Sequence, residues 1–140
     1  MDLNNLRNLS QKGQDDIAKQ ILQKCNPQSI ARELISNLEK NATEAAQRGE
    51  RKAFKSFTIW SETKYGNYRR ADGSIKYGEI EKKGPLVDFP DREKASEILF
   101  EMVQECVAYE NIQLTLDKND TDYNNSGYRR ACYISASVEW

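Results

Sequence analysis

Apolar side chains recur with helical spacing near the start of the chain. Ile17, Ile21 and Cys25 would lie on one face of a helix that covers residues 14–25. The preceding residues 1–13 are polar with scattered leucines, and we expect them to form a loose N-terminal arm.

A second helix is predicted from Pro27 to about Arg48. Asn26 has the side chain of a helix N-cap, and proline is favoured at the first helical position, where its missing backbone N–H removes no hydrogen bond. Apolar residues follow at spacings of three and four, and Gly49 stands where helices commonly end in left-handed backbone.

A third helix is predicted to begin at Asp88 or Asp91, beside Pro90, because aspartate is a frequent N-cap. Its apolar residues form one continuous stripe at helical spacing. The residues of this stripe are Ala95, Ile98, Leu99, Met102, Val103, Cys106 and Val107.

Between the second and third helices the pattern changes to that of strands. Residues 53–65 are rich in aromatic and β-branched side chains, which favours a strand. Asp72-Gly73 predicts a two-residue hairpin turn, and a returning strand would end at Gly84.

A register counted outward from this turn sets Glu62 opposite Lys83 and Arg69 opposite Lys76. The first pair is favourable, whereas two cations directly opposite each other destabilise a hairpin unless an acid or a bound anion lies between them. The register therefore suggests an anionic ligand near Arg69.

Residues 111–117 and 132–140 both alternate apolar and polar side chains, as expected for a hairpin with one buried face. The loop 117–125 between them is rich in Asp and Asn. A calcium-binding loop of the EF-hand type would need glycine and glutamate where the chain has Asn125 and Ala131, so we interpret the loop as turn structure.

The 140 residues are enough for one hydrophobic core, and we expect a single domain over 1–140. The patterns predict an α+β fold, with an antiparallel sheet of about four strands packed on one face by two to three helices. The predicted order is α-α-β-β-α-β-β.

Composition narrows the chemistry of this domain. The chain has no histidine, which removes the commonest general base and the commonest metal ligand. Cys25, Cys106 and Cys132 fall on apolar faces, so we expect buried reduced thiols, with a reactive or disulfide role as the alternative. We expect a protein that is not an enzyme and binds no cofactor or metal.

No apolar run approaches the length of a membrane span, and the first residues lack the apolar centre of a secretory signal. We therefore expect a cytoplasmic protein without a membrane partner.

The net charge of -1 is unevenly distributed along the chain. Residues 51–85 carry nine basic and four acidic side chains, whereas residues 86–140 carry five basic and eleven acidic ones. Such asymmetry serves either internal pairing or the recognition of a charged partner.

The basic region contains the first candidate site, for an anion or a nucleic acid. Tyrosine and arginine together suit stacking on bases and contact with phosphates, although an exposed hairpin of mixed polarity is also ordinary. The tetrapeptide that begins at Tyr68 recurs at Tyr128, through either an ancient duplication or coincidence. The residues of this site are Lys64, Tyr68, Arg69, Arg70, Lys76, Tyr77, Tyr128, Arg129 and Arg130.

The second candidate site is an acidic stripe on the third helix. Like charges four residues apart disfavour an isolated helix, so the stripe is either tolerated as a solvated face or kept for a basic protein partner. The residues of the glutamate stripe are Glu93, Glu97, Glu101 and Glu105.

The helix end EAAQRG at residues 44–49, and the terminal strand at residues 133–140, resemble small α+β proteins of unknown function encoded by phages, prophages and other mobile elements. The resemblance is one of pattern and covers about half the chain. It implies a class of non-enzymatic binders that includes inhibitors of host defence, and it carries no functional residues.

These observations predict a non-enzymatic small binding protein, an accessory or inhibitor protein of a phage or mobile element that acts on a host protein or nucleoprotein complex. The alternative is binding of RNA or single-stranded DNA through the basic hairpin. A homodimer is also expected if the terminal strand is an open sheet edge, because such an edge invites another strand.

Overall fold

The computed structural model describes residues 1–107 and 111–140. The described residues form three helices, a four-stranded antiparallel sheet in the order β4-β1-β6-β5, and a two-stranded hairpin, which confirms the predicted fold class and element order. The elements are α1 (Leu3–Leu22), α2 (Pro27–Gln47), β1 (Lys52–Lys64), β2 (Tyr68–Arg69), β3 (Ile75–Lys76), β4 (Ile80–Lys83), α3 (Arg92–Cys106), β5 (Ile112–Asp122) and β6 (Tyr128–Glu139).

The predicted caps set the ends of α2 and α3. The Asn26 side chain accepts hydrogen bonds from two backbone N–H groups at the start of α2, at 2.9 and 3.3 Å. Gly49 follows α2 with φ at 80°, a conformation that favours glycine. Asp91 caps α3 by accepting from the backbone N–H of Lys94. These confirmed predictions depend on local chemistry alone.

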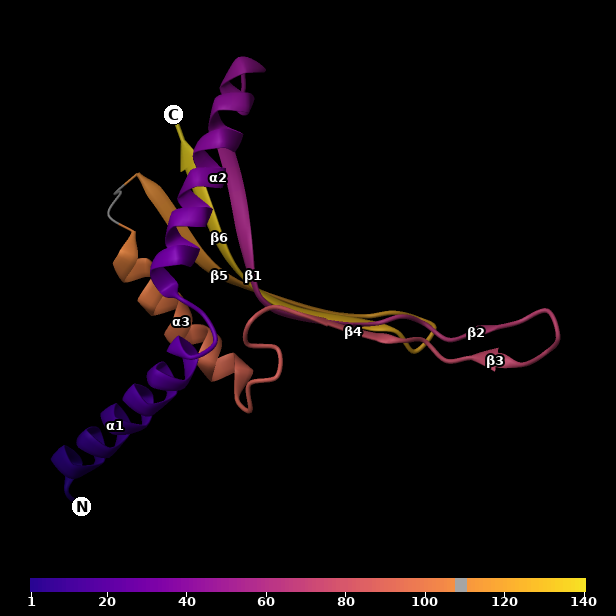
Figure 1. Ribbon diagram of the computed structural model, residues 1–140, viewed down its shortest axis with the longest axis horizontal. Helices are drawn as coiled ribbons and strands as arrows, with labels where there is room; N and C mark the ends of the chain where they lie inside the picture. The colour runs from indigo at the N-terminus through magenta and orange to yellow at the C-terminus, as the bar shows by residue number, and fades with distance from the viewer. Residues whose placement is uncertain (108–110) are drawn as a thin grey trace.

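The first helix begins eleven residues earlier than the hydrophobic pattern predicts, at Leu3 instead of residue 14. The Asp2 carboxylate caps it by accepting from the backbone N–H of Asn5 at 3.1 Å. None of residues 1–16 is buried, and the first half of α1 extends away from the other elements (Figure 1). Leu3, Leu6 and Leu9 recur here at spacings of three, which hints at a short amphipathic turn, but all three stay exposed, so this part of the helix forms without joining the core.

The hydrophobic core lies between one face of the sheet and the helices. Ile59, Leu99 and Ile134 are 0 % exposed, and Leu38 of α2 is 1 % exposed. Full burial of one such side chain contributes about 1.5–3 kcal/mol. The opposite face of the sheet is mostly polar, with Phe54 exposed on it, and none of the described helices covers it (Figure 1); there the hydroxyl groups of Ser56 and Ser135 meet at 3.1 Å.

The sheet bends where β1 contains a bulge between Thr58 and Trp60. Beyond the bulge the ends of β1, β5 and β6 run out together with β4, and the β2–β3 hairpin forms the tip (Figure 1). We call this part, residues 61–83 and 119–131, the arm.

The register of the arm differs from the prediction by one residue. The turn is a three-residue loop closed by Arg70 and Ser74, whose backbone N–H and carbonyl lie 2.7 Å apart, with Gly73 in the left-handed region at φ 90°. Arg69 consequently lies opposite Ile75. The predicted pair of opposed cations is therefore wrong, and so is the inference of an anion between them.

The partners of Lys76 and Glu62 shift in the same way. Tyr68 lies opposite Lys76, whose ammonium is 5.8 Å from the centre of the tyrosine ring, and Glu62 lies opposite Lys82. The Asp72 carboxylate accepts hydrogen bonds from the backbone and side chain of Ser74, which stabilises the longer loop.

The terminal strand β6 lies in the middle of the sheet, between β1 and β5. The condition for the predicted homodimer, an open edge at this strand, is therefore not met. β5 continues to Asp122, past the predicted end at residue 117, because the polar second half of the strand stays paired with β6.

Candidate functional site

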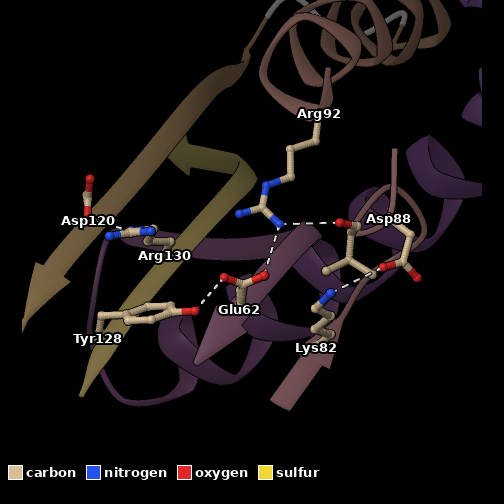
Figure 2. A network of polar contacts seen from close by, with 8 residues as sticks. Glu62, Lys82, Asp88, Arg92, Asp120, Tyr128 and Arg130 are labelled. Carbon is tan, nitrogen blue, oxygen red and sulfur yellow. Dashed lines mark hydrogen bonds and ion pairs between the residues drawn. The ribbon is translucent and has the colours of Figure 1, made fainter. Parts of the chain in front are cut away.

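A polar joint connects the arm to the start of α3 (Figure 2). The Arg92 guanidinium stacks 3.9 Å from the centre of the Trp60 ring, and it donates to the Glu62 carboxylate at 3.4 Å. The indole N–H of Trp60 donates to the Ser96 hydroxyl at 3.1 Å, and Ser96 donates to the backbone carbonyl of Arg92. Arg92 therefore ties the third helix to β1.

Glu62 extends this joint to β6. Its second carboxylate oxygen accepts from the Tyr128 hydroxyl at 2.8 Å. This hydrogen bond, and then Arg92, hold the pKa of Glu62 below its ordinary value, while partial burial opposes them. The same hydrogen bond raises the pKa of Tyr128.

Arg130 closes the joint on the far side of Tyr128. Its guanidinium stacks 4.5 Å from the centre of the tyrosine ring, and it pairs with Asp120 at 3.3 Å and Asp122 at 4.0 Å. Tyr128 and Arg130 thus have partners within the chain, and their binding of an external anion stays a prediction.

A groove lies on the uncovered face of the sheet at the base of the arm. Its volume is about 870 Å³, within the range of sites that hold a small ligand. The lining combines hydroxyl, amide, tyrosine and basic side chains. The lining residues are Thr58, Ser61, Thr63, Lys64, Tyr65, Gly66, Glu81, Lys83, Tyr123, Asn124, Asn125, Arg129 and Tyr133.

One wall of the groove carries a balanced set of charges. The Glu81 carboxylate accepts from the Tyr65 hydroxyl at 2.6 Å and pairs with the Lys83 ammonium at 2.8 Å. Lys83 and then Tyr65 lower the pKa of Glu81, and Glu81 raises the pKa of both partners. All three side chains face solvent, so these contacts orient them and add little to the free energy of folding.

The other cations of the groove have no acidic partner. Arg129 donates to the neutral hydroxyl of Tyr133 at 2.9 Å. Within residues 1–107 and 111–140, no carboxylate lies within 4.0 Å of the charged groups of Arg129 or Lys64. Their positive charge is therefore available to an anionic ligand.

Within the arm, glycine allows a close crossing of the backbone beside the groove, where the segment after β1 meets the β5–β6 turn. The Asn67 backbone N–H donates to the carbonyl of Asn125 at 3.1 Å, and its side chain accepts from the N–H of Gly78 at 2.8 Å. A β-carbon at Gly78 would overlap the backbone carbonyl of Tyr65. Only glycine fits at that crossing.

The tip of the arm is exposed, basic and partly aromatic. Tyr68, Ile75 and Tyr77 are 55 %, 50 % and 73 % exposed. Arg69 and Arg70 form no ion pair in the described part of the chain.

The two Tyr-Arg-Arg segments do not form one site. The first lies on the tip hairpin, whereas Tyr128 and its neighbours pair with β1 and β5 at the base of the arm. A sixty-residue duplication would make β1 equivalent to β5, but β1 is a central strand and β5 an edge strand. The sheet order thus gives the duplication no support.

The glutamate stripe lies on α3, away from the groove. Its four members, Glu93, Glu97, Glu101 and Glu105, are all exposed. Glu97 lies 3.9 Å from the Lys118 ammonium of β5, so one member already has a basic partner within the chain.

Lys64 and Arg129 were predicted from the sequence, whereas Lys83, Tyr123 and the groove as a whole were missed. The alternation of β6 that places Ile134 in the core also turns Tyr133 and Arg129 to the opposite face. That alternation could have placed Tyr133 and Arg129 on the uncovered face from the sequence alone. Nothing in the sequence indicates that Asn125 lines the groove, because its position depends on the crossing of two turns.

Among the described residues, no three histidine, cysteine, aspartate or glutamate side chains gather as a metal site would require. No described helix has the length and apolar character needed to cross a membrane.

We expect the Glu62→Gln variant to be less stable than wild type by about 1–3 kcal/mol at neutral pH, because it loses charge-assisted hydrogen bonds. The Glu62 contribution is fully present above its ordinary pKa of 4.5 and is lost as the pH falls through the lower pKa of the folded state. The difference between the two proteins should therefore shrink in acid. Urea unfolding followed by Trp60 fluorescence, in a Trp140→Phe background, measures this; parallel stability curves would contradict it.

Gly78→Ala should destabilise the arm by roughly 1–3 kcal/mol, since a backbone carbonyl cannot move aside for the new methyl group. Amide hydrogen exchange should show reduced protection at Asn67 and retained protection in α2. Gly13→Ala is the matched control, because nothing lies within 4 Å of its added carbon. Full protection of Asn67 in Gly78→Ala would show that the junction tolerates a side chain.

No protein-family model matches the chain, and neither a curated protein nor a solved structure is significantly similar to it. The resemblance to proteins of phages and mobile elements stays a prediction.

Proposed function

We propose that this protein binds single-stranded nucleic acid, RNA or DNA, along its arm from the tip to the groove. This was the alternative hypothesis from the sequence. The observation that carries it is the groove, where Arg129 and Lys64 have no acidic partner among the described residues and lie among three tyrosines, Tyr65, Tyr123 and Tyr133. Cations beside aromatic rings are the combination that single strands require, for phosphates and for unstacked bases.

The location of the groove favours a single strand over a duplex. It lies on an uncovered sheet face, where separated bases have room to lie flat against side chains. In a duplex the faces of the bases are stacked on one another and are closed to tyrosine. The paired bases of double-stranded RNA are recognised mainly by shape and backbone.

The charges elsewhere on the protein support the same path. The arm tip adds the positive charges of Arg69, Arg70 and Lys76 beyond the groove. The acidic residue among them is Asp72, and its carboxylate accepts hydrogen bonds from Ser74. The glutamate stripe lies on α3, which packs on the other face of the sheet. Its negative charge would repel a polyanion from the helices and leave the arm as the favourable surface.

A protein partner, the leading hypothesis from the sequence, remains a second candidate. Tyrosine and arginine are enriched among the residues that dominate protein interfaces, and both are exposed at the tip. The two candidates differ in their response to salt and in whether oligonucleotides bind at all.

We expect fluorescence anisotropy to show binding of a labelled mixed-sequence single strand at low salt, with affinity that falls steeply as salt is added. Arg69→Glu with Arg70→Glu should weaken binding and make the salt dependence shallower, by roughly 0.7 in logarithmic slope for each phosphate that the variant no longer neutralises. Reversal of Lys12 and Lys40, exposed cations of α1 and α2, is the matched control and should leave binding unchanged. No binding at low salt would exclude this function and favour the protein partner.

Tyr68→Ala and Tyr77→Ala should each weaken single-strand binding by about 1–3 kcal/mol, because each removes a stacking surface for one base. The exposed Phe54, on the body of the sheet outside the arm, provides the control variant Phe54→Ala. Titrations at fixed salt compare the three variants with wild type. Equal affinities in all of them would show that the tip does not contact bases.

A further inference from the structure

The side-chain amide of Asn125 is held flat at the edge of the groove. A β-carbon at Gly66 would overlap the carbon, oxygen and nitrogen of that amide, so the plane of the amide rests directly on the glycine backbone. The backbone of Asn125 is fixed as well, because its carbonyl accepts from the N–H of Asn67 at 3.1 Å. Neither the turn nor the amide plane is free to adopt many positions.

The hydrogen-bonding edge of this amide is unused. Across the described residues, neither Oδ1 nor Nδ2 of Asn125 has a hydrogen-bond partner within the chain. An amide provides one acceptor and two donor hydrogens, and its rigid plane sets an acceptor and a donor side by side. A ligand with a matching pair of groups would satisfy both at once.

We propose that Asn125 reads an adenine base in the groove, with Gly66 as its positioning residue. The inference rests on the proposed function and assigns a base preference to it. Oδ1 accepts from the adenine 6-amino group, and Nδ2 donates to the ring nitrogen beside it. Asparagine makes this bidentate pair with adenine in protein complexes with nucleic acids.

Adenine suits the amide better than the other bases do. Its amino group lies between N1 and N7, so both the Watson–Crick and the Hoogsteen edges present a donor next to an acceptor. Guanine, cytosine and uracil present such a pair on the Watson–Crick edge only, because the Hoogsteen edge of guanine has two acceptors and the pyrimidines have no ring nitrogen there. Lys64 and Arg129 line the same groove and would hold the adjoining phosphates.

The test compares labelled oligoadenylate and oligouridylate of equal length at one salt concentration. Wild type should bind oligoadenylate roughly tenfold more tightly, the size expected of one bidentate contact. In Asn125→Ala this ratio should fall toward one. Gly66→Ala should have the same effect, because its methyl group displaces the amide while overlapping only side-chain atoms of Asn125 and no backbone atom. Gly13→Ala should keep the wild-type ratio.

The outcomes separate this inference from the function on which it rests. Binding of both oligomers with equal affinity by wild type overturns the adenine preference and leaves the proposed function standing. A preference that persists in both Asn125→Ala and Gly66→Ala overturns the role of the amide. Failure of wild type to bind either oligomer at low salt overturns the function itself.

Discussion

The ion pair and hydrogen bond of Glu62 hold the arm in its position. Arg92 at the start of α3 and Tyr128 of β6 both contact this carboxylate, and the stacked Trp60 packs beneath the guanidinium. Side-chain exposures of 14 % for Glu62 and 23 % for Arg92 place the pair where solvent screens it less than on the surface. No described helix covers the outer part of the arm (Figure 1), so this joint and the paired strands that continue from the sheet are what connect the arm to the body of the protein (Figure 2).

An arm held in this way creates two different surfaces from one sheet. On one side of the sheet, the helices cover the core. On that side the charged groups at the base of the arm are paired with one another in the joint. On the other side, the sheet stays uncovered, and Arg129 faces a groove, where its partner among the described residues is the hydroxyl of Tyr133. The same strand β6 supplies the core through Ile134 and the groove through Tyr133, because its side chains alternate. Structure and candidate binding surface thus depend on the same pairing of strands.

The features that the sequence predicted are those with local causes. Asn26 and Asp91 cap their helices through bonds to residues two or three positions away, and the fold class followed from periodicity. The hairpin register failed because Asp72 and Ser74 favour a three-residue loop over the two-residue turn. The wall of the groove at Asn125 was out of reach for another reason: it forms where two turns meet, through contacts between residues far apart in the chain, such as Asn67 with Asn125.

The central claim is that the arm and the groove form one surface for a single strand. Backbone amide chemical shifts, recorded by NMR while a short single-stranded oligonucleotide is added, test it most directly. The account predicts that shifts concentrate in the arm, at the tip and around the groove, and leave α2 and the glutamate stripe unaffected. Shifts confined to α3, or none at low salt, would contradict it.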